Sequence, residues 1–223
     1  MAPGPDPAFD GLRFVITAGG TREPIDPVRY IGNRSSGKMG NELAAAAIRR
    51  GATVTLVTAA VPPAPQPGLD IVAVETTDDM HAAVRDALPG ARVLIMAAAV
   101  ADWRPRDVAA QKLKKGSSTM TLELVPTVDI LAWLRDDDAA AGVFRVGFAA
   151  ETEHAVERAR AKLAAKQLDL IVVNDVSQPG IGMGADDNEV TVIDRDGGVR
   201  TIARAPKSVV ADEIMVAVAD RLR

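Results

Sequence analysis

The segment from Gly32 to Met39, GNRSSGKM, nearly repeats the phosphate-binding pattern GxxxxGK[ST]. Met39 stands where that pattern needs a hydroxyl for Mg²⁺, and the segment begins well after the nearest apolar run instead of directly behind it. A Gly- and Ser-rich turn that opens a helix still offers N–H groups and a positive dipole end to an anion. The spacing therefore favours an anion site over a nucleoside-triphosphatase loop, and a Gly-rich helix start without a ligand is the alternative.

Lysines form two further groups that could bind phosphate. Lys112, Lys114 and Lys115 lie beside a Gly/Ser turn, and in an extended chain the first two point to one face. Lys162 and Lys166 are spaced i, i+4 on one face of a predicted helix. Ammonium groups capture phosphate as point charges. A charged edge strand and a solvated helix face would explain the same patterns without a ligand.

Apolar strands alternating with helices must position these groups. The expected strands cover 12–18, 52–58, 70–76, 92–100, 143–149 and 168–175, and the expected helices cover 38–51, 77–88, 128–136, 153–167 and 206–223. We place Thr77 at the cap of the second helix and Pro206 at the start of the last, and we predict a hairpin over 189–204. This order predicts an α/β fold: a doubly wound, mostly parallel Rossmann-like sheet with helices on both faces.

Three segments do not follow this alternation. Residues 103–125 lack a helical pattern, and 119–125 alternate as a strand does, so we expect an extra β-hairpin arm or flap. Residues 1–11 are rich in Pro and Gly, and we expect a linker or tail there, with 12–223 as a single domain. Residues 177–189 are predicted to form a Gly-rich loop.

Small and polar residues gather where the predicted parallel strands end. These ends are Thr17 to Gly20, Thr58, Ala98 to Asp102, Gly147 to Ala149, and Asn174 with Asp175. Ligands of open parallel sheets bind beyond the carboxyl ends of the strands. Small residues let a ligand approach the backbone, and the Asp102 carboxylate could hold Mg²⁺ or a polar ligand group. We therefore expect the binding site along this edge.

Composition excludes several classes of protein. The chain has 223 residues and 48% hydrophobic side chains, enough for a core, and it contains no Cys. Cys nucleophiles, Cys-ligated zinc and iron–sulfur clusters are therefore excluded. A net charge of −4 argues against a nucleic-acid partner. No apolar run reaches the roughly 18 residues of a membrane helix, and the first residues do not resemble a signal peptide. We expect a cytoplasmic protein.

Taken together, these stretches resemble the bacterial type of phosphopantothenate–cysteine ligase, the ligase domain of a bifunctional protein of coenzyme A biosynthesis. The matching stretches are ITAGGTREPIDPVRYIGNRSSGKMG, AAAVADWRP, KLKK, VGFAAET, AKLAAKQLDLIVVNDV and the loop before DNEVTVID. The resemblance implies two steps. The carboxylate of 4′-phosphopantothenate attacks the α-phosphate of CTP, and L-cysteine then displaces CMP from the acyl-cytidylate. No protein nucleophile is needed, which agrees with the absence of Cys.

The resemblance also implies roles for single residues. Asn33 matches the residue that contacts the acyl-cytidylate, and Lys112 matches one implicated in forming it. Ser35 and Gly37 are expected to line the phosphate or intermediate site. CTP binding is assigned to Asp102, Lys112, Thr127, Val128, Asp129, Ile130, Phe148, Lys162 and Lys166. Many relatives have Asn-Pro in place of Thr127 and Val128, so backbone contacts are expected from these two.

The same resemblance implies partners. We expect Mg²⁺ with CTP, a homodimer with residues 103–125 near its interface, and fusion to or association with a flavin-dependent phosphopantothenoylcysteine decarboxylase. Two other functions are alternatives. An NAD(P) oxidoreductase would need a Gly fingerprint after the first strand and an acidic residue ending the second, which instead ends Thr58-Ala59-Ala60. A non-catalytic nucleotide-binding module would be favoured if Asn33 or Lys112 were missing.

Overall fold

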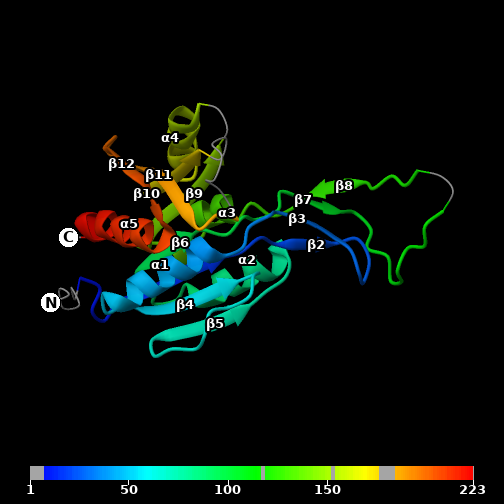
Figure 1. The fold of residues 1–223 in the computed structure, drawn as a ribbon, viewed down its shortest axis with the longest axis horizontal. Coiled ribbons are helices and arrows are strands. Elements are labelled where there is room, and N and C mark those ends of the chain that lie inside the picture. The colour runs from blue at the N-terminus through cyan, green and yellow to red at the C-terminus, as the bar shows by residue number, and fades with distance from the viewer. Residues whose placement is uncertain (1–7, 117–118, 152–153, 176–183, 223) are drawn as a thin grey trace.

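One eight-stranded sheet forms the centre of the computed structural model, which describes residues 8–116, 119–151, 154–175 and 184–222 (Figure 1). The strand order is β12-β11-β10-β9-β6-β1-β4-β5. The parallel strands are β1 (Arg13–Ala18), β4 (Thr53–Thr58), β5 (Leu69–Ala73), β6 (Val93–Met96), β9 (Phe144–Glu151) and β10 (Leu170–Asp175). β11 (Asp187–Asp194) and β12 (Val199–Pro206) add the antiparallel hairpin. The predicted mostly parallel α/β sheet is confirmed.

Helices cover both faces of this sheet. On one face, α1 (Lys38–Arg49) and α5 (Lys207–Leu222) pack on Phe14 and Ile16. On the other, α2 (Thr77–Ala87) and α3 (Ile130–Asp136) pack on Val15, while α4 (Ala155–Ala165) covers β9 and β10. A 3₁₀ turn at Asp138–Ala140 follows α3. Alternate residues of each strand point to opposite faces, so burial on both sides explains the continuous apolar runs.

Two helix starts differ from prediction by one residue. Thr76, not Thr77, caps α2: its hydroxyl accepts from the Asp79 N–H at 3.1 Å, and its own N–H donates to the Asp79 carboxylate at 3.0 Å. Thr77 is already helical, and its buried hydroxyl donates to Glu23 at 2.8 Å. Pro206 is the last residue of β12, and α5 begins at Lys207. The capping-box pairing selects the threonine three residues before Asp79.

The expected arm is present, but less of it is strand than the alternation predicts. β7 (Trp103–Pro105) pairs antiparallel with β8 (Leu124–Pro126), and the chain between them extends away from the sheet (Figure 1). Residues 119–123, predicted as strand, pair with no other strand in the described residues. Alternating apolar and polar side chains do not form a strand unless the backbone has a pairing partner. Beside β7 lies a second hairpin, β2 (Arg22–Pro24) with β3 (Tyr30–Gly32), that the Pro-rich sequence did not indicate.

The packed part of the chain begins before residue 12, where the sequence predicted the domain to start. Phe9 is fully buried against Phe14, with ring centroids 4.8 Å apart, and its N–H donates to the Arg50 carbonyl at 2.9 Å. One aromatic side chain thus places the end of the expected linker or tail in the core. Residues 1–7, and 177–183 of the predicted Gly-rich loop, lie outside the described residues.

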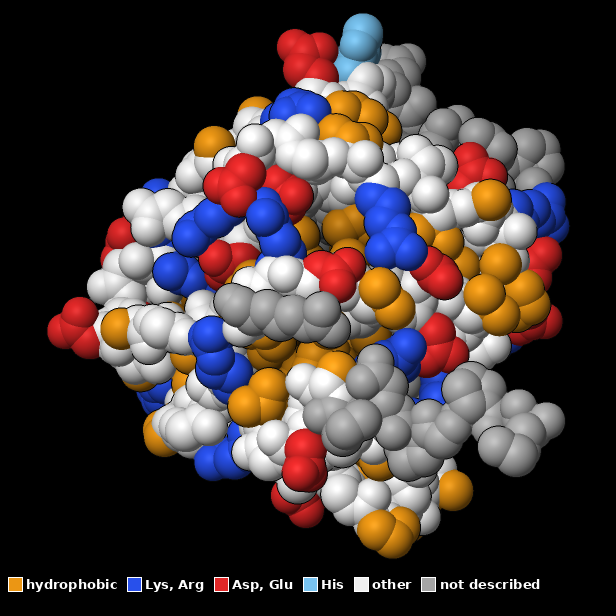
Figure 2. Space-filling view, turned by 90° about the vertical axis from the view of Figure 1, so that its left-hand side faces the viewer, with side chains coloured by type: hydrophobic (Ala, Val, Ile, Leu, Met, Phe, Trp, Pro, Cys, Tyr) orange, Lys and Arg blue, Asp and Glu red, His pale blue; other side chains and the backbone are white. Residues whose placement is uncertain are grey.

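The end of the molecule opposite the arm has interspersed basic and acidic side chains (Figure 2). Arg50 and Arg49, at the end of α1, both donate to Asp212 of α5, at 2.6 and 3.0 Å. These ion pairs tie the two helices of one face together. None of the helices in the described ranges is long and apolar enough to cross a membrane.

Gly40 sets how closely α1 approaches β1. A Cβ there would lie 2.5 Å from the Ala18 Cβ and 2.9 Å from the Thr17 carbonyl oxygen. Gly40→Ala is therefore expected to lower the free energy of unfolding by about 1–3 kcal/mol, measured by urea denaturation. Gly116→Ala, where an added Cβ meets nothing within 4 Å, is the control and should change it by less than about 0.5 kcal/mol. Equal stability of the two variants would contradict this close packing.

Candidate functional site

A cavity of about 400 Å³ lies beyond the carboxyl ends of β6, β9 and β10, beside the first turn of α1. The predicted site residues that line it are Asn33, Ser35, Gly37, Asp102, Val128, Asp129, Ile130, Phe148, Lys162 and Lys166. The strand-end segment Ala97 to Val100 forms its floor. The parallel sheet thus brings together side chains that are more than a hundred residues apart in sequence.

The first turn of α1 presents its N-terminus to this cavity. Gly37, the N-cap, has φ +78, and no side chain caps the helix. A Cβ on Gly37 would lie 2.7 Å from the Ala60 Cβ, so only glycine fits there. The first turn contains no acidic residue. The backbone N–H groups and the dipole of α1 therefore favour an anion at this end of the cavity.

Asn33 is held between two strand ends. Its Nδ2 donates to the carbonyls of Ala99 and Val100, each at 3.0 Å. The Ala99 N–H donates in turn to the Gly19 carbonyl at 2.8 Å. A Cβ on Gly20 would lie 2.5 Å from the Asn33 carbonyl oxygen, so glycine permits this close approach. The backbone segments that follow β1 and β6 thus fix the Asn33 amide in the lining of the cavity.

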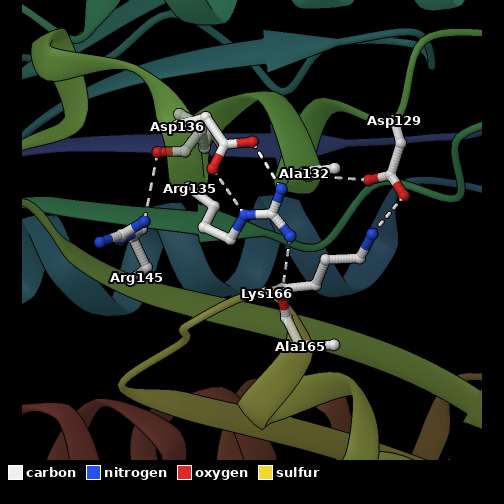
Figure 3. Close-up of polar contacts among 8 residues, drawn as sticks. Asp129, Ala132, Arg135, Asp136, Arg145, Ala165 and Lys166 are labelled. Atoms are coloured by element: carbon white, nitrogen blue, oxygen red, sulfur yellow. Dashed lines mark hydrogen bonds and ion pairs between the residues drawn. The ribbon is translucent and has the colours of Figure 1, made fainter.

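Lys162 of α4 and Lys166, its C-cap, also line the cavity, and Figure 3 shows Lys166 directed toward Asp129. Lys166 Nζ lies 2.5 Å from Asp129 Oδ2, and Asp129 Oδ1 accepts from the Ala132 N–H at 2.9 Å as the N-cap of α3. Lys162 Nζ donates to the Phe148 carbonyl at 3.0 Å. The Lys166 side chain is only 21% exposed, so these lysines do not form a merely solvated helix face.

Opposing influences set the charge of Asp129. Burial raises the pKa of its carboxyl group, but the Lys166 hydrogen bond, the Ala132 N–H and the charges of Lys166 and Lys162 outweigh burial. The net pKa lies below its usual value, so Asp129 is ionised at neutral pH. An ionised Asp129 keeps Lys166 directed toward the strand ends.

Asn188 and Lys207 line the cavity although the sequence did not indicate them, whereas Asn174 and Lys38 belong to a predicted strand end and to the anion-binding pattern. Asn174 Nδ2 donates to Asn188 Oδ1 at 2.6 Å, and Lys38 Nζ lies 2.5 Å from Asp186. Lys207 is 5% exposed, and its Nζ donates to the Ala185 carbonyl at 2.5 Å. Burial, together with the nearby charge of Lys38, lowers the Lys207 pKa. A lysine at the first position of a helix opposes the dipole, and this signal could have singled out Lys207.

Two predicted residues lie outside the lining. The Thr127 hydroxyl donates to the Ala101 carbonyl at 2.6 Å and its N–H donates to the Asp102 carbonyl at 3.0 Å, so Thr127 joins the end of the arm, after β8, to the segment between β6 and β7. The CTP-binding role expected of Thr127, through its backbone, stays a prediction. Lys112 is exposed on the arm, and the described part of the chain does not bring it to its own cavity.

The acidic residues lining the cavity are Asp102 and Asp129, and Asp129 is engaged by Lys166. Within the described ranges no group of three or more His, Cys, Asp or Glu side chains could hold a metal ion. Asp102 is exposed at the cavity. One carboxylate suits a Mg²⁺ ion that a triphosphate already coordinates, and it does not form a protein cage.

Known proteins match nearly the whole chain. The profile described as "DNA/pantothenate metabolism flavoprotein C-terminal domain" matches residues 9–222. The chain is 46% identical over 212 residues to the "Coenzyme A biosynthesis bifunctional protein CoaBC" of Bacillus subtilis, covering 95% of this chain and 52% of that protein. It is 42% identical over 226 residues to the protein of that name from Mycobacterium tuberculosis, covering 93% and 52%. The chain thus spans about half the length of the curated relatives it matches.

Solved structures share the fold. The crystal structure of the C-terminal domain of a bifunctional CoaBC protein superposes with a TM-score of 0.81 at 38% identity, covering 96% of this chain and 97% of that one. A Cab2 mutant in complex with phosphopantothenate-cysteine gives a TM-score of 0.75 at 17% identity, covering 94% and 87%. At that identity the second comparison supports the fold alone.

Proposed function

The chain belongs to the DNA/pantothenate metabolism flavoprotein C-terminal domain family, and from this premise we propose that it ligates 4′-phosphopantothenate to L-cysteine with CTP. Its relatives named for coenzyme A biosynthesis support this assignment. The observation that carries it is the cavity itself, where the open N-terminus of α1 and Asn33 face the α4 lysines and Phe148. The cavity can thus hold the two anionic substrates, 4′-phosphopantothenate and CTP, side by side.

The chemistry requires positioning more than covalent catalysis. In the first step a carboxylate oxygen of 4′-phosphopantothenate bonds to the α-phosphorus of CTP, the bond to the β-phosphate bridge breaks, and pyrophosphate leaves. In the second step the amine of L-cysteine bonds to the acyl carbon, the carbon–oxygen bond to the nucleotide breaks, and CMP leaves. Holding reactants in line and neutralising phosphate charge supplies most of such catalysis.

We assign the two ends of the cavity to the two substrates. Phe148 packs on the cytosine, and Lys162 and Lys166 contact the ribose or phosphates of CTP. Asp102 and the turn Val128 to Ile130 complete the nucleotide site. Ser35, Gly37 and the N–H groups of α1 bind phosphate or the intermediate, with Asn33 against the acyl-cytidylate. Mg²⁺ bound with CTP would offset phosphate charge, with Asp102 as its protein contact.

We propose a homodimer in which the arm of one chain supplies Lys112 to the cavity of its partner. Exposed apolar side chains support an interface on the arm and the neighbouring hairpin: Val28, Tyr30, Trp103, Val108, Met120 and Leu124. Apolar groups gathered on one surface mark interaction sites. We further propose a cytoplasmic enzyme that is fused to or associated with a flavin-dependent phosphopantothenoylcysteine decarboxylase.

Lys112→Gln is expected to slow the first step by about 10²–10³-fold, because charge developing on the α-phosphate loses a cationic partner. The measurement is pyrophosphate release from CTP without cysteine. Pyrophosphate release at the wild-type rate would contradict this role and would show that Lys112 is only a solvated surface charge.

Co-expression of Lys112→Gln chains with Asn33→Asp chains distinguishes action within a chain from action across the dimer. Each mixed dimer has one cavity with an intact Asn33 and an intact Lys112 from its partner. Random pairing should then restore about a quarter of wild-type activity. No restored activity would contradict the supply of Lys112 across the dimer.

Pyrophosphate release from CTP tests the function as a whole. Release should require 4′-phosphopantothenate, and CMP together with the cysteine conjugate should form only after L-cysteine is added. An oxidoreductase or a silent nucleotide-binding module would release no pyrophosphate under any of these conditions.

A further inference from the structure

Asp26 is a buried carboxylate outside the cavity, in the turn between β2 and β3. It accepts from the N–H groups of Val28 at 2.8 Å and Arg29 at 2.9 Å. The Arg29 guanidinium donates to it through both Nε, at 2.9 Å, and Nη2. Hydrogen bonds from the Arg29 side chain hold the pKa of Asp26 well below its usual range. The turn therefore contains a permanently charged, paired carboxylate.

This ion pair binds a residue 87 positions further along the chain. The Leu113 N–H donates to Asp26 Oδ2 at 3.1 Å, and the Leu113 carbonyl accepts from Arg29 Nη2 at 2.7 Å. Both backbone polar groups of Leu113 are thus held by charged partners, which make stronger hydrogen bonds than neutral ones. Nearby, the Ala109 N–H donates to the Ile25 carbonyl at 3.0 Å.

Leu113 stands between the arm lysines, Lys112 and Lys114. Residues 110–116 form no helix or strand, so no regular element fixes the backbone of these lysines. A long side chain on such a segment explores a wide volume unless the backbone is held. Hydrogen bonds at both the N–H and the carbonyl of Leu113 fix its backbone, and they therefore fix the Cα positions from which the side chains of Lys112 and Lys114 extend.

We propose that Asp26, through its ion pair with Arg29, is a positioning residue that holds Leu113 and thereby places Lys112 and Lys114 for the first step. The inference rests on the proposed function for the meaning of that step. Asp26 does not line the cavity, so its influence passes through the backbone of the arm. A merely structural role is the alternative, since the bonds to the Val28 and Arg29 N–H groups alone would stabilise the turn.

Asp26→Asn separates the two roles. An amide oxygen can still accept from the turn N–H groups, but the amide nitrogen accepts nothing and carries no charge to pair with Arg29. We expect trypsin to cleave the native variant after Lys112, Lys114 and Lys115 about tenfold faster or more than wild type. Asp107→Asn, which removes an exposed carboxylate from the same arm, should leave cleavage unchanged.

Leu113→Pro gives an independent variant on the exposed arm, away from the core. Proline removes the N–H that Asp26 accepts, whereas the matched Leu113→Ala keeps it. Trypsin should cleave Leu113→Pro faster than wild type after Lys114 and Lys115, the sites that remain because a Lys–Pro bond resists trypsin, and it should cleave Leu113→Ala at the wild-type rate. This pair keeps the test valid if Asp26→Asn fails to fold. Wild-type cleavage of both Asp26→Asn and Leu113→Pro would overturn the proposal.

Kinetics then test the positioning itself. Asp26→Asn and Leu113→Pro should lower kcat for pyrophosphate release about tenfold or more, with KM for CTP changed less than kcat, because the nucleotide contacts other than Lys112 stay intact. Faster cleavage with wild-type kcat would show a purely structural contact and would overturn the positioning role. A wild-type protein that releases no pyrophosphate would refute the proposed function instead, and the cleavage rates would still report whether Asp26 holds the arm.

Discussion

Asn33→Asp is expected to let the acyl-cytidylate form while lowering the rate of the second step by about 10³-fold or more. The Asn33 Nδ2 donates to the carbonyls of Ala99 and Val100. A carboxylate only accepts hydrogen bonds, so it would face two carbonyl oxygens and add negative charge beside an anionic intermediate. Mass spectrometry of acid-quenched reactions should show the trapped intermediate.

Gln66→Glu makes the same amide-to-carboxylate change on an exposed loop and serves as the control. It should turn over as wild type does and accumulate no intermediate. Turnover of Asn33→Asp at the wild-type rate would contradict the role assigned to Asn33.

The enzyme is expected to prefer CTP over ATP by about 10⁴ in kcat/KM, because a site that pairs the hydrogen-bonding groups of one base rejects a base that leaves them unpaired. Met96, the last residue of β6, pairs with Gly147 of β9, so Phe148 lies one residue beyond this pair, and it lines the same cavity as Asp102 of the segment after β6. In the proposed site the backbone at these positions would pair with the cytosine edge; adenine is larger than cytosine, and packed strand ends yield little.

Steady-state kinetics with each nucleotide, at equal Mg²⁺, cysteine and 4′-phosphopantothenate, measure this preference. Values of kcat/KM within a factor of about three, under 1 kcal/mol of discrimination, would contradict the proposed base recognition. The ligase reaction would survive that result, because it depends on phosphate and carboxylate chemistry and not on the base.

The buried strands and the long helices could be predicted because both faces of the sheet are covered. Runs such as Phe14 to Ala18 then leave little choice of structure. The β2–β3 hairpin could not be predicted from the sequence, because Pro24 argues against a strand. The Asp26 turn that joins its strands also depends on a hydrogen bond from Leu113, 87 residues further along the chain. Phe9 shows the same limit, because its burial depends on Phe14 and Arg50 and not on its Pro- and Gly-rich neighbours.

The cavity could be predicted in outline from the rule that ligands bind at strand ends. That rule indicated Phe148; the family resemblance assigned Asn33 and the α4 lysines to the site, and all of these side chains line one cavity. Lys207 and Asn188 were not expected, because they reach the cavity from the antiparallel hairpin and from α5, whose placement is a tertiary property. The position of Lys112 also could not be predicted, since the arm that contains it extends away from the sheet (Figure 1), and in the described ranges Lys112 is not among the residues that line its own chain's cavity.

Isotope transfer tests the central claim, ligation through an acyl-cytidylate, most directly. The measurement uses 4′-phosphopantothenate labelled with ¹⁸O in its carboxylate, together with CTP and L-cysteine. Because the carboxylate oxygen bonds to the α-phosphorus and stays there when cysteine displaces the acyl group, one ¹⁸O should appear in CMP and none in pyrophosphate. Cysteine conjugate formed with unlabelled CMP, or with label in any other phosphate product, would contradict the account.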